Sequence, residues 1–283
     1  MISQDKVLGI IYLNLTLFGV IGNSFLLYLH SFKLFTGYRK KPISLIVIHL
    51  AFVNTIMILF RGIPRILEVW NLKSSLDFIG GKIITYLIRV TWGLSLCSTC
   101  LLSVFQAITI SPYTPTWAGF KSKAPKSIVP CCIFFWFFNL LVDVALPVYV
   151  TGPRNISKVK WNIGYSSFDL YAINTIKIVI WKSICDVVFV GIMTCSSSYM
   201  VFVLYRHHQQ VQHTLNTSLS PRVPSETRAT KVILMLVISF VILTAVSSPL
   251  IIYMASHVVS KTWVINVTVF LPLLSSSQPL YAA

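Results

Sequence analysis

The chain has 283 residues, of which 55% are hydrophobic and only 11% are charged, and its mean hydropathy is +0.78. A soluble domain carries about 25% charged residues, so this composition excludes a soluble enzyme, a disordered chain and a collagen-like fibre. Lys and Arg exceed Asp and Glu by 23 to 7, but they lie mostly between apolar runs, which favours a role in membrane topology over nucleic-acid binding.

Seven apolar runs are long enough to cross a bilayer core about 30 Å thick, which takes roughly 20 helical residues. Lipid offers no partner to an unpaired backbone group, so each run must form a helix. The expected spans are residues 7–29, 43–60, 83–110, 128–150, 175–205, 232–254 and 263–280. They form one domain over residues 1–283, without an internal repeat, and the first run is too long for a cleavable signal peptide.

Basic residues around the first span predict the orientation. Four cations follow this span, namely Lys33, Arg39, Lys40 and Lys41, whereas only Lys6 precedes it. The basic side of the first helix usually stays in the cytosol, so the N-terminus is expected outside the cell. The connection of residues 151–174 is then external, and Asn155, in an Asn-Ile-Ser sequon, is a candidate glycosylation site.

Motifs of catalysis are absent, so we expect neither an enzyme nor a cofactor. The six cysteines all lie in apolar runs, and none lies in an external connection. We therefore expect no disulfide. The tract with His207, His208 and His213 favours a solvated basic face over a metal site, because structural sites usually need four ordered ligands.

Ionisable side chains in the outer halves of the spans are the candidates for a ligand site. A charge at membrane depth costs about 2.5–3.5 kcal/mol and usually faces the interior of the bundle. An acidic or hydrogen-bonding ligand would suit Arg89 and Lys177, although Lys177 can instead extend to the interface. Asp186 lies one turn after Lys182, so the two either neutralise each other or line an outward-facing cavity. The candidate ligand contacts, including two aromatic residues that also fit an interface belt, are Tyr86, Arg89, Lys177, Trp181 and Asp186.

Several stretches resemble a known receptor family. Gly22 and Asn23, within GNSFLLY, resemble the first-span signature of G-protein-coupled receptors. Residues 101–112 (LLSVFQAITISP) and 204–213 (LYRHHQQVQH) are similar to vomeronasal type-1 receptors, as are residues 123–126 (KAPK) and 147–152 (PVYVTG). The resemblance extends from about residue 8 to residue 272.

This resemblance implies an all-α membrane protein, a seven-transmembrane-helix bundle with the rhodopsin-like G-protein-coupled receptor architecture. It implies a plasma-membrane receptor that binds a pheromone or other small semiochemical in the outer half of the bundle. An inhibitory-class heterotrimeric G protein would be its second partner, besides the lipid bilayer. The residues expected to face this G protein are Gln106, Ser111, Lys123, Arg206, His207 and Arg228.

The chain also departs from the family's pattern. Gly81 and Ser166 stand near the positions where the family has a cysteine at the head of span 3 and another in the second outer loop. The loss of such a disulfide lowers the free energy of unfolding by about 2–4 kcal/mol. The sequence of span 7 also departs from the family's pattern, as does the lack of a basic tail after Ala283. A receptor remnant that does not signal is therefore an alternative, whereas a transporter is disfavoured because no repeat is detectable.

Overall fold

The structure is a computed structural model that describes residues 4–36, 42–70, 78–112, 114–144, 150–151, 160–163, 166–169 and 173–214. The expected spans of residues 232–254 and 263–280 lie outside the described residues, as do Pro147 and Asn155.

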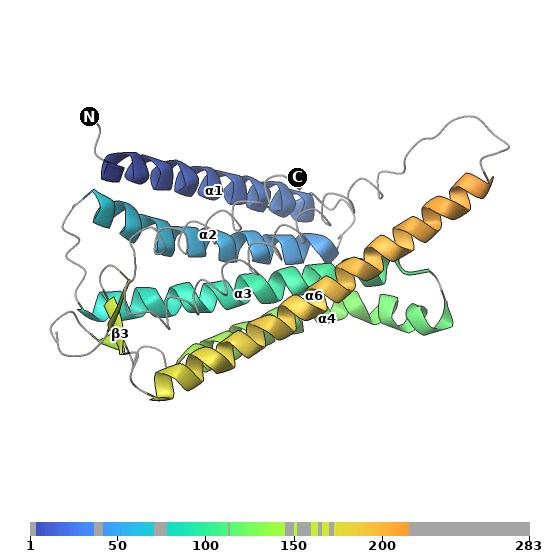
Figure 1. The fold of residues 1–283 in the computed structure, drawn as a ribbon. Helices are drawn as coiled ribbons and strands as arrows, with labels where there is room; N and C mark the ends of the chain where they lie inside the picture. The colour runs from blue at the N-terminus through green and yellow to red at the C-terminus, as the bar shows by residue number, and fades with distance from the viewer. Residues whose placement is uncertain are drawn as a thin grey trace.

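Five helices make up most of the described chain: α1 (Gln4–Phe35), α2 (Pro42–Val69), α3 (Phe78–Ile110), α4 (Pro115–Asp143) and α6 (Ile173–Thr214). All five are long and apolar enough to cross a membrane. Successive helices run in opposite directions, as the colours in Figure 1 show. α1 packs on α2, and α3 packs against α2, α4 and α6. α3 is therefore the central helix of the described bundle.

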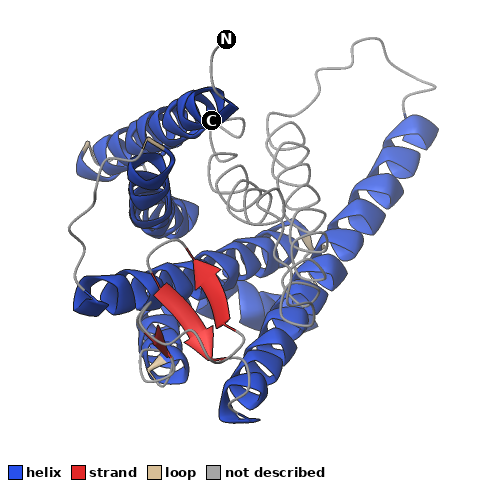
Figure 2. Cartoon of the chain, turned by 60° about the vertical axis from the view of Figure 1, so that its left-hand side comes forward, coloured by secondary structure: helices blue, strands red, loops and turns tan. Residues whose placement is uncertain are grey.

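Three short strands lie at one end of the bundle: β1 (Val150–Thr151), β2 (Lys160–Ile163) and β3 (Ser166–Asp169). They form an antiparallel sheet in the order β1-β3-β2, with Trp161 opposite Phe168. β3 contacts α3, and Figure 2 shows the strands beside the helices at this end. We call this the sheet end, and the opposite end, where α3 leads into α4, the turn end. The hydropathy pattern contained no signal for the sheet.

The start of α4 differs from the sequence expectation, which placed the span at residues 128–150. The helix runs from Pro115 to Asp143 and includes Pro125 and Pro130. Pro115 is tolerated because it stands in the first turn, where a backbone N–H has no helical partner. Thr114 is the extended N-cap residue, and the Ala118 N–H donates to its carbonyl at 2.9 Å. Pro115 and Pro125, which precede the expected start of the span at residue 128, thus lie inside a helix.

α6 is longer than any bilayer requires. Its 42 residues extend over about 63 Å at 1.5 Å per residue, whereas its apolar span is only Ser183–Val203. Figure 1 shows the C-terminal part of α6 projecting beyond the other helices at the turn end. The tract that begins at Arg206, expected as a loop, is helical as far as Thr214.

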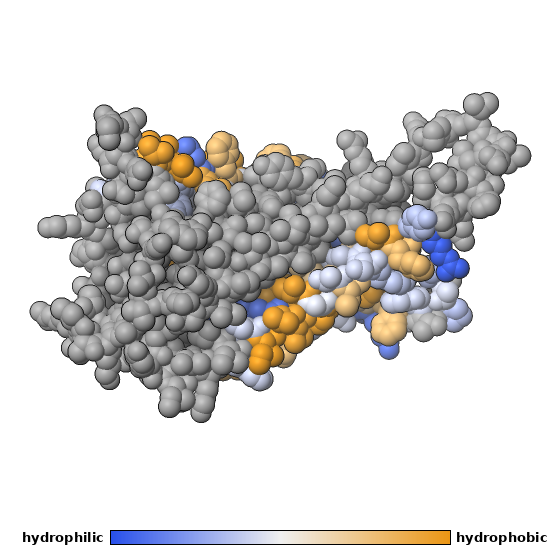
Figure 3. Space-filling model, viewed as in Figure 1, coloured by the Kyte–Doolittle hydropathy of each residue, from blue (hydrophilic) through white to orange (hydrophobic). Residues whose placement is uncertain are grey.

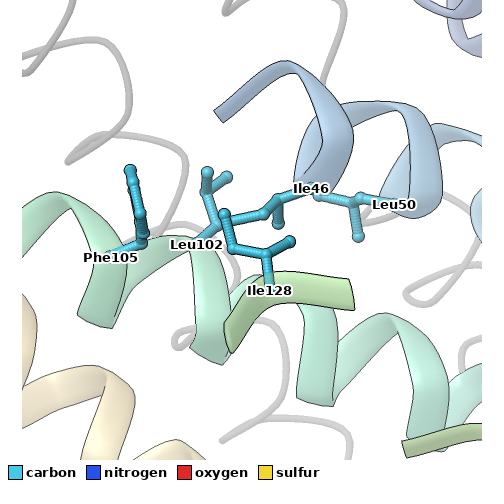
Figure 4. Close-up of a cluster of buried hydrophobic side chains, with 5 residues drawn as sticks. All are labelled: Ile46, Leu50, Leu102, Phe105 and Ile128. Carbon is cyan, nitrogen blue, oxygen red and sulfur yellow. The ribbon is translucent and has the colours of Figure 1, made fainter. Parts of the chain in front are cut away.

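Among the described residues, four clusters of buried apolar side chains hold the helices together. The cluster nearest the turn end joins Ile46 and Leu50 of α2 to Leu102 and Phe105 of α3 and Ile128 of α4 (Figure 4). A second cluster joins the same three helices nearer the sheet end, around Val53, Val90 and Leu94. The remaining two connect α1 with α2 and α3 with α6, through Tyr12, Ile58, Ile66, Leu96 and Met193.

α1 and α2 approach closely because small residues separate them. A Cβ atom at Gly62 would lie 2.3 Å from the Thr16 Oγ1 atom, and a Cβ atom at Gly9 would lie 2.1 Å from the Trp70 Nε1 atom. Glycine at an interface lets two backbones pack tightly, which is how helices associate in lipid, where hydrophobicity provides little driving force.

Hydroxyl groups inside the spans bond to their own helices. Thr16 donates to the Tyr12 carbonyl, Thr85 to the Gly81 carbonyl and Thr99 to the Ser95 carbonyl, each at 2.7–2.8 Å. The outer surface is apolar instead. In Figure 3 apolar side chains gather in the lower middle of the described surface, and most of the hydrophilic ones lie toward the turn end. This distribution fits a bundle surrounded by lipid.

Candidate functional site

The central helix carries three of the candidate residues, and a fourth directly follows its last residue. Tyr86 and Arg89 lie in the sheet-end half of α3, whereas Gln106 and Ser111 lie at its turn end. Within the α3 span, Ile79–Ile110, an 18-residue apolar stretch is 72% buried. One helix surrounded by protein therefore connects the expected ligand site with the expected G-protein site.

Tyr86 links α3 to the end of α4. Its hydroxyl donates to the Leu140 carbonyl at 2.9 Å. Leu140 lies in the last turn of α4, where carbonyl groups have no helical partner. Tyr86 therefore fixes the end of α4 beside the candidate site, and its hydroxyl is already engaged.

Arg89 is half-buried one turn further along α3. Its Nε atom is buried and has no hydrogen-bond partner among the described residues. An unsatisfied donor on a charged group is costly, by about 1–3 kcal/mol or more. Arg89 thus has a buried donor atom that an acceptor from a ligand could satisfy.

α6 separates its candidate residues onto different faces. Asp186 is half-buried and lies on the stripe that continues with Met193, Ser197 and Met200, which are buried. Trp181 is 58% exposed and lies just before the apolar span, where tryptophan is common at membrane interfaces. The side chains of Lys177 and Lys182 lie outside the described residues, so their expected roles remain predictions.

At the turn end, four side chains join three helices; we call them the turn-end junction: Ser111, Trp117, Lys121 and Tyr199. The Ser111 hydroxyl donates to the Ala107 carbonyl at 2.7 Å and lies 3.0 Å from the Tyr199 hydroxyl. The Lys121 ammonium group donates to the Ser111 carbonyl at 2.6 Å, where its charge complements the C-terminal end of α3. The rings of Trp117 and Tyr199 are 5.9 Å apart.

Gln106 lies one and a half turns before this junction. Its side chain is 4% exposed, and neither atom of its amide has a hydrogen-bond partner among the described residues. In this conformation it faces protein rather than an open surface. Lys123 and Arg206 are exposed, whereas the His207 side chain and the whole of Arg228 lie outside the described residues.

A polar chain at mid-depth was missed by sequence reasoning. The Trp136 Nε1–H donates to the His49 Nε2 atom at 2.8 Å, and the His49 Nδ1 atom lies 2.9 Å from the Ser98 hydroxyl. An indole N–H can only donate, so Nε2 must be unprotonated, and His49 is neutral with its proton on Nδ1. The Ser98 hydroxyl then donates to the Leu94 carbonyl at 2.6 Å. These residues tie α2, α3 and α4 together.

A second feature that sequence reasoning missed lies nearer the sheet end. Arg61 was assigned to a connection, but α2 continues through Pro64 to Val69. The Arg61 guanidinium carbon lies 5.8 Å from the ring centroid of Trp92 on α3. Among the described residues, no three His, Cys, Asp or Glu side chains converge as metal ligands.

Comparison with known proteins identifies the family. The profile of the vomeronasal organ pheromone receptor family matches residues 7–276. Vomeronasal type-1 receptor 1 of Gorilla gorilla gorilla is 38% identical over 91% of this chain and 74% of its own length. Vomeronasal type-1 receptor 3 of Homo sapiens is 38% identical over 97% and 90%, respectively. Olfactory receptor class A-like protein 1 of Danio rerio is 32% identical over 83% and 75%.

The fold agrees with a solved receptor structure. Squid rhodopsin superimposes with a TM-score of 0.70 at 16% sequence identity, over 99% of this chain and 77% of that chain. The bundle therefore defines a multi-pass membrane protein with the rhodopsin-like fold of G-protein-coupled receptors, and not an enzyme. Within that class, the chain belongs to the vomeronasal organ pheromone receptor family, which includes the vomeronasal type-1 receptors.

Proposed function

We propose that the chain binds a small semiochemical at the sheet end and signals through an inhibitory-class G protein at the turn end. The N-terminus and the sheet end then face the outside of the plasma membrane. The observation that carries the proposal is Arg89, a cation on the buried central helix whose Nε atom lacks a hydrogen-bond partner among the described residues.

The central helix offers a route from ligand to G protein. A ligand that binds one arrangement of the bundle better than another shifts the populations of the two. Arg89 and the turn-end junction share α3, so a small movement of this helix changes the surroundings of both. Gln106 gains hydrogen-bond partners if the turn end opens around a G protein, which would favour the bound state.

The test uses cells that express the chain with a biosensor for inhibitory-class G proteins, exposed to a broad panel of semiochemicals. We expect a dose-dependent response that disappears when inhibitory-class G proteins are inactivated. Arg89→Gln removes a charge-assisted contact and should raise the half-maximal ligand concentration about tenfold or more.

Two further variants make the result specific. Arg206→Gln, on the projecting part of α6, should lower the maximal response without moving the half-maximal concentration. Lys33→Gln, which changes an exposed cation of α1 that we assign to neither site, should change neither quantity. If no compound elicits a response although the chain reaches the cell surface, the proposal is wrong.

The expected orientation has its own test. With the N-terminus outside, an antibody should reach a tag at Met1 in intact cells, and treatment with a glycosidase should increase the mobility of the chain on a gel. Asn155→Gln should abolish this change in mobility. A tag at Met1 that is reached only after permeabilisation would contradict the orientation.

A retained remnant is the second candidate, because Gly81 and Ser166 replace the family's cysteine pair. β3 nevertheless contacts α3, so the sheet docks on the bundle without that bond. Surface labelling separates the two candidates. Retention in the endoplasmic reticulum that is relieved by Gly81→Cys with Ser166→Cys would favour the remnant.

A further inference from the structure

Exposed side chains of α4 form one continuous face. They recur every three or four residues, which places them along one side of the helix. From the sheet end to the turn end, this face consists of Leu141, Phe137, Ile133, Pro130, Lys126 and Lys123. Its apolar part faces the acyl chains, because only 11% of the apolar stretch of α4 is buried. The two lysines therefore stand where the same side of the helix meets the lipid headgroups.

The depth of the two lysines matches that of the headgroups. Residues 127–142 carry no charge, and as a helix they extend over about 24 Å. The hydrocarbon core is about 30 Å thick, so Lys126 and Lys123 begin near its boundary at the turn end, and their flexible stems carry the ammonium groups further out. Phe120, which is 58% exposed, lies one turn beyond Lys123, with its ring 5.9 Å from that of Trp117. Tryptophan is enriched at this level of a membrane.

The described acidic residues are all distant from these lysines along the bundle. They lie in its sheet-end half, namely Asp5, Glu68, Asp143, Asp169 and Asp186. The described charged residues of the turn-end half are cations, and Lys123 and Lys126 are both exposed there. Anionic lipids attract clustered Lys and Arg residues at a membrane surface. The described charges at the turn end therefore complement an anionic headgroup.

Neighbouring side chains indicate which headgroup fits. Lys123 and Lys126 are three residues apart, so their stems begin about 5–6 Å apart on adjacent turns. Lysine binds phosphate as a point charge, and two such charges suit a headgroup that carries more than one phosphate.

Two exposed hydroxyl groups flank the lysines. The Ser122 hydroxyl donates to the Gly119 carbonyl at 3.0 Å. The Ser127 hydroxyl donates to the Lys123 carbonyl at 3.3 Å. A hydroxyl that donates still has lone pairs with which to accept, and an inositol ring supplies hydroxyl donors. Phosphates on such a ring would meet the lysines while its hydroxyl groups meet the serines.

We infer that Lys123 and Lys126, together with the two serines, bind the headgroup of an inositol phospholipid that carries more than one phosphate. The inference moves Lys123 from the expected G-protein surface to a lipid site. It rests on the proposed function only through the orientation, which places the turn end in the cytosolic leaflet, where anionic lipids are found. The site itself needs neither a semiochemical nor a G protein.

The experiment counts bound lipids by native mass spectrometry of the purified full chain in detergent micelles, without a G protein. The probes are phosphatidylinositol bisphosphate and phosphatidylserine, with soluble inositol trisphosphate as a competitor. We expect the bisphosphate lipid to bind about tenfold more tightly than phosphatidylserine or better, because its headgroup carries more negative charge. The soluble competitor should displace this lipid only at about tenfold excess or more, because it lacks the acyl chains that pack on the apolar part of α4.

Variants then assign the effect to the two lysines. Lys123→Gln with Lys126→Gln should weaken binding of the bisphosphate lipid about thirtyfold, which corresponds to about 2 kcal/mol. Lys123→Arg with Lys126→Arg keeps both charges, so binding should stay within about threefold of the wild type. Equal melting temperatures would show that these exposed substitutions leave the fold intact.

Single changes provide the matched control. Lys126→Gln alone should weaken binding about fivefold. Lys33→Gln, which removes an exposed cation at the turn end of α1, should weaken it less than about twofold. Ser122→Ala with Ser127→Ala should narrow the preference for the inositol lipid over phosphatidylserine.

The inference is overturned if phosphatidylserine binds as tightly as the bisphosphate lipid, or if the soluble competitor displaces that lipid at equal concentration. It is also overturned if the double Gln variant binds as the wild type does, if Lys33→Gln loses as much as Lys126→Gln, or if the serine variant keeps the full preference. These outcomes are separable from the proposed function. A receptor that responds to a semiochemical without this lipid selectivity keeps its function, whereas selective lipid binding by a chain that does not signal keeps the inference and removes the function.

Discussion

α3 and α4 are nearly equal in hydropathy but opposite in environment. An 18-residue apolar stretch within each span has a mean hydropathy of 1.7 in α3 and 1.6 in α4, yet 72% of that stretch is buried in α3 against only 11% in α4. The difference lies in the size and polarity of the side chains. The middle of α3 is rich in small residues (SLCSTC, residues 95–100), whereas α4 carries bulky aromatic ones (FFWFF, residues 134–138).

This contrast shows what positions a helix inside a membrane protein. Lipid tails are as apolar as leucine, so hydrophobicity alone does not draw one helix inward. Small residues allow close approach, and hydroxyl groups bond between helices, as Ser95 does to the Asn54 side chain at 2.7 Å. Large aromatic residues such as Phe134 and Phe137 remain exposed to the membrane.

The contrast also explains why both candidate sites depend on α3. A helix that contacts three others transmits a shift at one end to the other, whereas a helix that mainly faces lipid does not. α4 contributes mostly by anchoring its neighbours: its contacts of Leu140 with Tyr86 and of Lys121 with Ser111 hold the α3 side, and Trp136 holds His49 of α2.

The largest expected effect comes from placing an α4-type side chain on α3. Ser98→Phe inserts an aromatic ring at a fully buried position and removes the hydroxyl that bonds to His49. Overpacking and the lost bond together should lower the free energy of unfolding by about 4 kcal/mol. Thermal unfolding in micelles measures it. Phe137→Leu, on the exposed side of α4, should change the free energy of unfolding by less than about 0.5 kcal/mol. Similar losses for both variants would contradict the difference in environment between α3 and α4.

The second-largest effect on stability should come from the polar chain of Trp136, His49 and Ser98. His49→Ala leaves a cavity and deprives the Trp136 N–H of its acceptor, so we expect a loss of about 3 kcal/mol. His30 is the matched control, because its contact to Ser44 is 3.3 Å long and only part-buried. His30→Ala should cost about 1 kcal/mol or less. Equal unfolding temperatures for the two variants would show that the His49 contacts do not connect the helices.

Close packing of α1 on α2 should contribute a smaller amount to the free energy of unfolding. Gly62→Ala forces Thr16 to move away from the new Cβ atom, for an expected loss of about 2 kcal/mol. Gly191→Ala, on an exposed face of α6 with no atom within 4 Å, should be neutral or stabilising by up to about 1 kcal/mol, because alanine is the better helix former. Unfolding titrations in a denaturing detergent compare the two, and a larger loss at Gly191 would contradict this packing.

The turn-end junction should show the smallest effect on stability. Tyr199→Phe keeps the ring against Trp117 but removes the hydroxyl near Ser111, for a loss of about 1 kcal/mol. A double-mutant cycle with Ser111→Ala should show that the two losses are not additive. Fully additive losses would mean that the two hydroxyl groups do not interact.

Sequence reasoning found the membrane class and the helical character of the first five spans because long apolar runs are a local signal. It placed Tyr86, Arg89 and Gln106 on one helix for the same reason, with Ser111 directly after it. It missed the contact of His49 with Trp136, because those residues are 87 positions apart and no periodicity connects them. It placed Arg61 in a connection because the apolar run of the second span ends at residue 60, whereas α2 stays helical as far as Val69 and Arg61 contacts Trp92 of α3.

The most direct test of the account is photolabelling with a diazirine-bearing lipid, followed by peptide mapping of the folded receptor in a bilayer. The carbene reacts with whatever side chain touches the acyl chains. We predict strong labelling of residues 133–141 of α4 and weak labelling of residues 94–102 of α3. Equal labelling of the two segments would contradict the central position of α3, and with it the route that we propose from ligand to G protein.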